Sequence, residues 1–117
     1  MPENMTPNIF SELITNLPEA DIPFQGVRGW ISQGADHQIL FFEIDAAIGK
    51  IPEHRHGAQW GVVVEGEMEL DIAGDVRVYK NGDHYFVPDH VAHSATFRKK
   101  TWAIDFFADK NRYAPKA

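Results

Sequence analysis

The sequence predicts an all-β domain, a sandwich or barrel built from seven or eight short strands. The chain contains three Trp, three Tyr and eight Phe together with many Val and Ile residues, a composition that favours sheet. Short apolar stretches, some with a clean two-residue period, are separated by turn residues such as Gly, Asn and Asp. Strands do not alternate with long helices, so a parallel α/β fold is excluded.

The N-terminal region, residues 1–26, is expected to form an arm outside the barrel. Residues 1–8 are polar and contain two prolines. Residues 9–17 have apolar side chains at a helical spacing, and Pro18 stops the pattern. We therefore expect a short helix or an irregular edge strand within this arm.

From residue 27 the pattern changes to strands. The alternation is clearest over residues 68–73, where apolar and acidic side chains take turns. Residues 46–52 are expected to turn the chain. The barrel is expected over residues 27–109 and a C-terminal tail over residues 110–117. The expected strands are 27–32, 37–45, 59–65, 68–73, 76–79, 84–88, 92–97 and 101–107.

Length, charge and composition limit the functional classes. The 117 residues suit one domain with its own core. A net charge of -6 and a pI of about 5.4 argue against a nucleic-acid partner. The absence of Cys excludes disulfides and thiolate ligands. The sequence shows no secretory signal and no apolar run of about 18 residues, so we expect a cytoplasmic protein that does not bind a membrane.

A histidine pair marks the candidate site. His54 and His56 are two positions apart, and such residues on a strand point to the same side. Both can therefore reach one ion at about 2.0–2.1 Å. Gln59 is an odd step away, but Gly57 permits a turn or bulge that resets the alternation. Alone, the pair is equally typical of two solvated histidines near a loop; a third histidine, His93, lies far along the chain.

The spacing around these histidines adds specificity. Residues 49–66 read G-x4-H-x-H-x2-Q-x6-G, and residues 82–93 read G-x5-P-x4-H. These two stretches resemble the signature motifs of the cupin superfamily. The resemblance implies a jelly-roll barrel of six to eight strands (a double-stranded β-helix), one divalent metal ion (Zn, Ni, Fe or Mn) in its mouth, and a homodimer. It also implies four metal ligands, which are His54, His56, Gln59 and His93.

The chain departs from these motifs in three places. The gap between His56 and Gln59 is one or two residues short, and Phe97 replaces the final Asn. His90 stands where the family has Gly. Two interpretations of His90 are open, a surface histidine or a pocket acid, and the first is favoured.

Gln59 replaces the more usual glutamate. A carbonyl oxygen leaves the site with the full charge of the ion, which strengthens its Lewis acidity. Gln59 also provides no anionic ligand for a higher oxidation state, so polarising chemistry is favoured over redox chemistry. The alternative is that Gln59 is only a polar residue inside a barrel without metal.

A narrower resemblance connects the chain with the pectin-degradation cupins, which linearise unsaturated uronates and use three His and one Gln. Asp105 follows His93 by twelve residues, as a functional aspartate does in that group, and Phe107 matches an aromatic two positions later. The family arginine falls on Asn111, with Arg112 one position late.

The strand pattern supports a catalytic role for Asp105 independently. An Asp on a largely apolar strand is costly to bury without a partner, whereas near a cation it would be a stabilised base. The alternative is that Asp105 faces water. On the Gln59 strand, Gly61 and Val63 share the ligand face, so we expect both to line the pocket with Phe107. Gly61 would leave room for a small ligand or only relieve a bend, and Trp60 is expected to face outward at a dimer contact.

Three functions remain open. The first is a metal-dependent lyase or isomerase that acts on a small oxygenated acid or sugar derivative through an enolate-like intermediate. The second is an Fe(II) dioxygenase at the same site. The third is a non-enzymatic module that binds a small ligand, because a fold does not specify a reaction.

Overall fold

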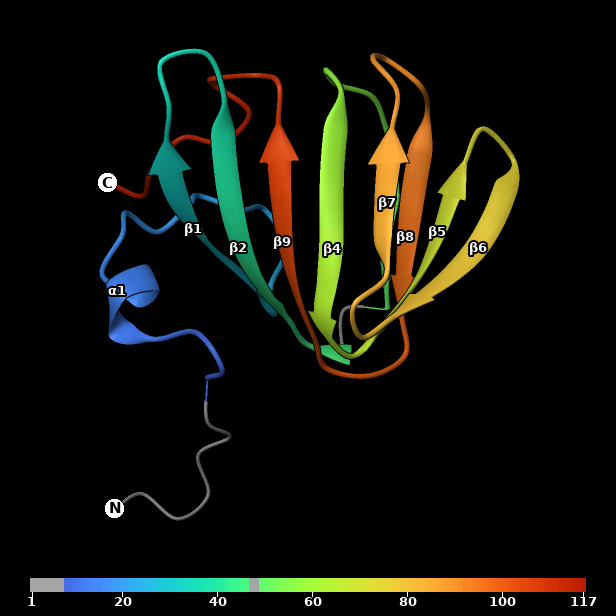
Figure 1. Ribbon diagram of the computed structural model, residues 1–117, viewed down its shortest axis with the longest axis horizontal. Coiled ribbons are helices and arrows are strands. Elements are labelled where there is room, and N and C mark those ends of the chain that lie inside the picture. Colours follow the sequence, from blue (N-terminus) through green and yellow to red (C-terminus); the bar gives the residue numbers. More distant parts are fainter. Residues whose placement is uncertain (1–7, 47–48) are drawn as a thin grey trace.

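The computed structural model describes residues 8–46 and 49–117. Residues 1–7 of the expected arm and residues 47–48 of the expected turn lie outside this description. Two antiparallel sheets face each other in a sandwich (Figure 1). The prediction of an all-β jelly-roll barrel with a short helical N-terminal segment is confirmed.

Each of the eight expected strands is present, with ends within one residue of the prediction. The five-stranded sheet has the order β1-β2-β9-β4-β7, and the four-stranded sheet has the order β3-β8-β5-β6. Across the described ranges, no helix is both long and apolar enough to cross a membrane. The elements are α1 (Glu12–Thr15), β1 (Val27–Gln33), β2 (Gln38–Ile44), β3 (Lys50–His54), β4 (Gln59–Glu65), β5 (Glu67–Ile72), β6 (Asp75–Lys80), β7 (His84–Val87), β8 (His93–Phe97) and β9 (Thr101–Phe107).

Strand β3 is the one strand that the sequence pattern did not indicate, because residues 46–52 were expected to be a turn. It contains Pro52 and two charged residues, and its pairing with β8 is irregular between Ile51 and His54. Proline is tolerated here because β3 is an edge strand. This strand ends at His54, so its position determines where the first histidine lies.

Apolar side chains fill the space between the two sheets. Leu40, Val63 and Val87 are fully buried there. A second, smaller cluster lies on the outer face of the five-stranded sheet, where Phe10 from the N-terminal arm packs edge-on against Trp30. The first part of the arm therefore covers one end of that outer face, whereas Ile22 and Phe24 further along the arm line the cavity between the sheets.

The C-terminal segment is not a loose tail. Residues 114–116 form backbone hydrogen bonds with residues 19–21, including an isolated bridge between Ala20 and Pro115. Lys116 also forms an ion pair with Glu19. This pairing holds residues 110–117 against the barrel, and it brings two of them, Arg112 and Tyr113, to a cavity between the sheets.

Gly66 provides a test of the fold. Its φ is +117°, and an added Cβ would lie 2.6 Å from the Lys100 carbonyl oxygen, which is backbone and cannot easily move. We expect Gly66→Ala to lower the free energy of unfolding by about 2 kcal/mol or more, measured by urea denaturation. Gly74→Ala is the matched control, since Gly74 has φ +89° but open space around it; it should cost only about 1 kcal/mol, the penalty of a side chain in the left-handed region. Equal losses would contradict the close approach at Gly66.

Candidate metal centre

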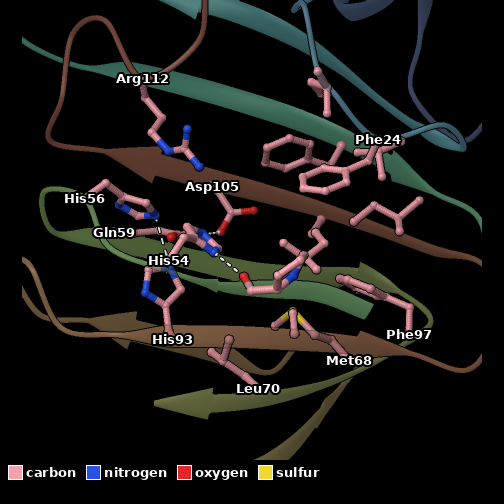
Figure 2. A pocket seen from close by; sticks show the side chains of 18 of the residues that line it. Phe24, His54, His56, Gln59, Met68, Leu70, His93, Phe97, Asp105 and Arg112 are labelled. Atoms are coloured by element: carbon pink, nitrogen blue, oxygen red, sulfur yellow. Dashed lines mark hydrogen bonds between the residues drawn. The ribbon is translucent and has the colours of Figure 1, made fainter. Parts of the chain in front are cut away.

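The three motif histidines meet at one end of the cavity. His54 is the last residue of β3, His93 is the first residue of β8, and the two are directly paired across these strands. His56 follows in the loop after β3. One potential ligand atom from each ring lies within 4.8 Å of the others, and Figure 2 shows the rings turned toward one another.

The backbone determines which nitrogen of each ring is available. Nδ1 of His54 lies 2.8 Å from the Pro52 carbonyl oxygen, Nδ1 of His56 lies 2.7 Å from that of Gly57, and Nδ1 of His93 lies 2.9 Å from that of Val91. A carbonyl oxygen only accepts hydrogen bonds, so each Nδ1 carries the proton. In the neutral rings every Nε2 then has a free lone pair, which is the arrangement that second-shell carbonyls impose on metal-binding histidines.

The spacing of these lone pairs suits a cation. Nε2 of His56 and Nε2 of His93 are 3.0 Å apart, and two bare acceptors at that distance repel each other. Two nitrogens that each lie about 2.1 Å from one ion at a right angle are about 3.0 Å apart. The separation of His56 and His93 therefore matches that of two ligands of one divalent ion, and His54 lies beside them.

Burial keeps the three rings neutral. Burial lowers the pKa of His54, His56 and His93, and the nearby positive charge of Arg112 lowers each further; the pKa of His56 falls to about 4. Only the neutral ring can bind a metal. At neutral pH the three side chains are consequently ready to act as ligands without losing a proton.

Gln59 begins β4 and lines the same cavity. Its Nε2 donates a 2.8 Å hydrogen bond to Oδ1 of Asp105. Because the amide nitrogen is used in this contact, the carbonyl oxygen is free for another partner. The ligand role expected for Gln59 remains a prediction.

Asp105 lies inside the barrel and not in water, with 3% of its surface exposed. Its Oδ1 accepts two hydrogen bonds of 2.8 Å, one from Gln59 and one from the hydroxyl of Tyr85. Burial raises the pKa of Asp105 to about 6, although both hydrogen bonds act in the opposite direction. Phe107, two residues further on β9, lines the cavity with its ring 5.4 Å from that of His56.

Two residues expected to line the pocket do not. Val63 is fully buried in the core between the sheets. Gly61 is paired with Tyr85 on one side and Asp105 on the other, and any Cβ there would collide with both side chains. The space over Gly61 is thus occupied by the Tyr85–Asp105 contact and is not open to a ligand.

Sequence reasoning did not identify Tyr85 or assign Arg112. In the sequence Tyr85 is an ordinary strand aromatic, and only the register across β7, β4 and β9 brings it to Asp105 over Gly61. Arg112, and not Asn111, lines the cavity because the C-terminal segment folds back. Its guanidinium carbon lies 4.4 Å from the Tyr113 ring centre, and among the described residues its buried Nε has no hydrogen-bond partner.

His90 lies on the surface, as favoured from the sequence. Its side chain is 71% exposed and contacts the carboxylate of Asp89. Its φ is +56°, which accounts for a glycine at this position in the family motif. The backbone N–H of His90 donates a 2.7 Å hydrogen bond to the carbonyl oxygen of His56, so this position steadies the ligand loop through its main chain.

Comparison with known proteins agrees with this fold. The family profile described as the cupin domain matches residues 41–104, and the chain belongs to the cupin family. No curated protein matches the chain. Among solved structures, an RmlC-like cupin from Shewanella frigidimarina NCIMB 400 is 27% identical, with a TM-score of 0.70 over 86% of this chain and 90% of that one.

Two further solved structures share the fold at lower identity. KdgF from a Halomonas species is 23% identical, with a TM-score of 0.68 over 88% of this chain and 92% of that one. A cupin superfamily protein from Desulfitobacterium hafniense DCB-2 is 16% identical, with a TM-score of 0.66 over 90% of this chain and 94% of that one.

Metal binding should stabilise the fold. At a zinc concentration a hundred times the dissociation constant, we expect the free energy of unfolding to rise by about 2.7 kcal/mol, seen as an increase of several degrees in Tm. The chelator EDTA should reverse this increase, and His93→Ala should abolish it. His90→Ala is the matched histidine control and should retain the full increase. An equal zinc response in both variants would contradict the three-histidine centre.

Proposed function

We propose that this cupin is a metal-dependent lyase or isomerase that acts on a small oxygenated acid or sugar derivative. The observation that carries the proposal is that three bare imidazole nitrogens, a buried carboxylate and an unpaired guanidinium nitrogen belong to one cavity. Together these groups can bind an anion, polarise it and move a proton. No single group in the set could do all three.

His54, His56 and His93 would hold the ion, and the free carbonyl oxygen of Gln59 makes it the fourth ligand in this proposal. Imidazole and amide ligands suit Zn, Ni, Fe or Mn. Once bound, the ion would polarise substrate oxygens and stabilise enolate-like negative charge. Because Gln59 is neutral, the ligand set adds no charge that would weaken this effect.

Asp105 is the proposed base. Tyr85 and Gln59 both hold Oδ1, so Oδ2 is the oxygen left to take a proton from a substrate carbon and return it. A pKa of about 6 suits this role, since the group is mostly ionised at neutral pH and still basic enough to accept a proton. Tyr85 is a positioning residue, because its hydroxyl donates a hydrogen bond that fixes the carboxylate of Asp105.

Arg112 is the proposed partner of a substrate carboxylate. Arginine forms paired hydrogen bonds with carboxylates, and the buried Nε provides a donor without a partner among the described residues. The resemblance to uronate-linearising cupins supports an acidic substrate. Although Arg112 is one position later than the family arginine, its position in the cavity supports the same role, the binding of a substrate carboxylate.

The reaction class can be tested with a simple 2-oxo acid. In deuterium oxide, zinc-loaded protein should exchange the C3 protons of 2-oxobutanoate, followed by proton NMR. Asp105→Asn should lower the exchange rate by about 10²–10⁴-fold. Tyr85→Phe should lower it less, because the base is displaced but still present. EDTA should stop the exchange and zinc should restore it.

His90→Ala is the control and should exchange at the wild-type rate. Oxygen uptake that requires iron would instead identify a dioxygenase. Unchanged exchange in Asp105→Asn would rule out the proposed base, whereas no exchange with the zinc-loaded wild type would favour a ligand-binding module.

We also propose a homodimer through the outer face of the five-stranded sheet. Trp60, Phe86 and Phe106 form a row across β7, β4 and β9, and each is between 41% and 56% exposed. Such contiguous aromatic surface is typical of protein interfaces. Light scattering should show a dimer for the wild type and a monomer for Trp60→Asp. Glu65→Asp is the control, and a monomeric wild type would refute the dimer.

A further inference from the structure

The cavity is polar at one end only. Its volume is about 350 Å³, within the range of small-molecule sites. The histidines, Asp105 and Arg112 form one side in Figure 2, whereas Phe24, Met68 and Phe97 lie toward the other. The lining of that second part is hydrocarbon, apart from the thioether of Met68, and its main residues are Phe24, Phe42, Ile44, Met68, Leu70 and Phe97.

The strand register shows how far the apolar part extends. On β8, His93, Ala95 and Phe97 all line the cavity, and the five residues from His93 to Phe97 span about 13 Å. On β5, Leu70 and Met68 are paired with Ala95 and Phe97, so both strands present apolar side chains beyond the histidine. The apolar part therefore extends along β5 and β8 away from His93.

The five-stranded sheet shows the same change from polar to apolar side chains along the cavity. Asp105 on β9 is followed along the cavity by Ala103, and Ala103 is paired with Phe42 on β2. Ile44 continues this line one step further along the same strand face. Both sheets thus change from polar to apolar side chains along the cavity.

This division selects among ligands. A hydroxyl group placed beside Ile44, Met68 or Phe97 would lose its hydrogen bonds to water and find no replacement among these side chains. A sugar acid has hydroxyls along its whole length, so most of them would face hydrocarbon. A methylene chain or a ring in the same place would instead gain from burial.

We propose that the ligand is a small carboxylate with an apolar tail, aliphatic or aromatic, and not a polyhydroxylated sugar acid. The placement of the ligand's carboxylate rests on the proposed function, because the ion and Arg112 would bind that group. The tail lies in the apolar part of the cavity. At about 30 Å³ for each water-sized group, the whole cavity has room for about twelve such groups.

Straight-chain carboxylates test this directly, because binding needs no turnover. Isothermal titration of zinc-loaded wild-type protein with acetate, butanoate, hexanoate and octanoate should show about fourfold tighter binding per added methylene. Galacturonate should bind no tighter than acetate. Equal affinity for all four acids, or galacturonate binding tighter than hexanoate, would overturn the proposal.

Two variants separate the head from the tail. Arg112→Gln should weaken the binding of every acid by a similar factor. The increase in affinity with chain length should stay unchanged. Met68→Gln is close in size and places an amide beside the tail, so it should reduce that dependence and leave acetate binding unchanged. If affinity no longer increased with chain length in Arg112→Gln but still did so in Met68→Gln, the assignment of the carboxylate-binding and apolar parts of the cavity would be overturned.

The same measurements distinguish this proposal from the proposed function. If tail length increases affinity but the protein catalyses no proton exchange, the ligand class holds and the lyase or isomerase activity fails. If exchange occurs and is fastest with sugar acids, the activity holds and the apolar tail is wrong.

Discussion

The site depends on three backbone carbonyls that each accept a hydrogen bond from Nδ1 of a neighbouring histidine. The carbonyls of Pro52, Gly57 and Val91 fix the ring orientations, so three Nε2 lone pairs face one another. Burial and the positive charge of Arg112 keep the rings neutral, and repulsion between lone pairs 3.0 Å apart is relieved when a cation lies between them. The barrel supplies this arrangement because β3 and β8 are paired at the two histidines His54 and His93. The metal centre is thus a consequence of strand register and local turns.

A second constraint operates across β7, β4 and β9. Gly61 has no side chain, and for that reason Tyr85 and Asp105 can meet over the strand between them. Their contact fixes Oδ1 of Asp105, and the same oxygen orients the amide of Gln59. One glycine therefore allows a single hydrogen-bond network to position both the proposed base and the proposed fourth ligand.

Much of this could be predicted from the sequence, because strand periodicity and turn residues are local properties. The ends of eight strands and the histidine spacing followed from such patterns. Strand β3 did not, since an edge strand tolerates Pro52 and charged residues that resemble a turn. Gly61 was assigned to open space because its partners come from strands 20 or more residues away, and their register is not written in any local pattern. Arg112 lies in the cavity because residues 114–116 pair with the N-terminal arm. This is a tertiary contact, which no local sequence pattern indicates.

The central claim is that three imidazoles from distant segments bind one ion. X-ray absorption at the zinc K-edge of the zinc-loaded protein tests it most directly, because it counts the ligands and measures their distances. The account predicts three imidazole nitrogens at about 2.0–2.1 Å, with the remaining positions filled by oxygen. A spectrum with one imidazole or none would contradict the account, whatever the protein's activity.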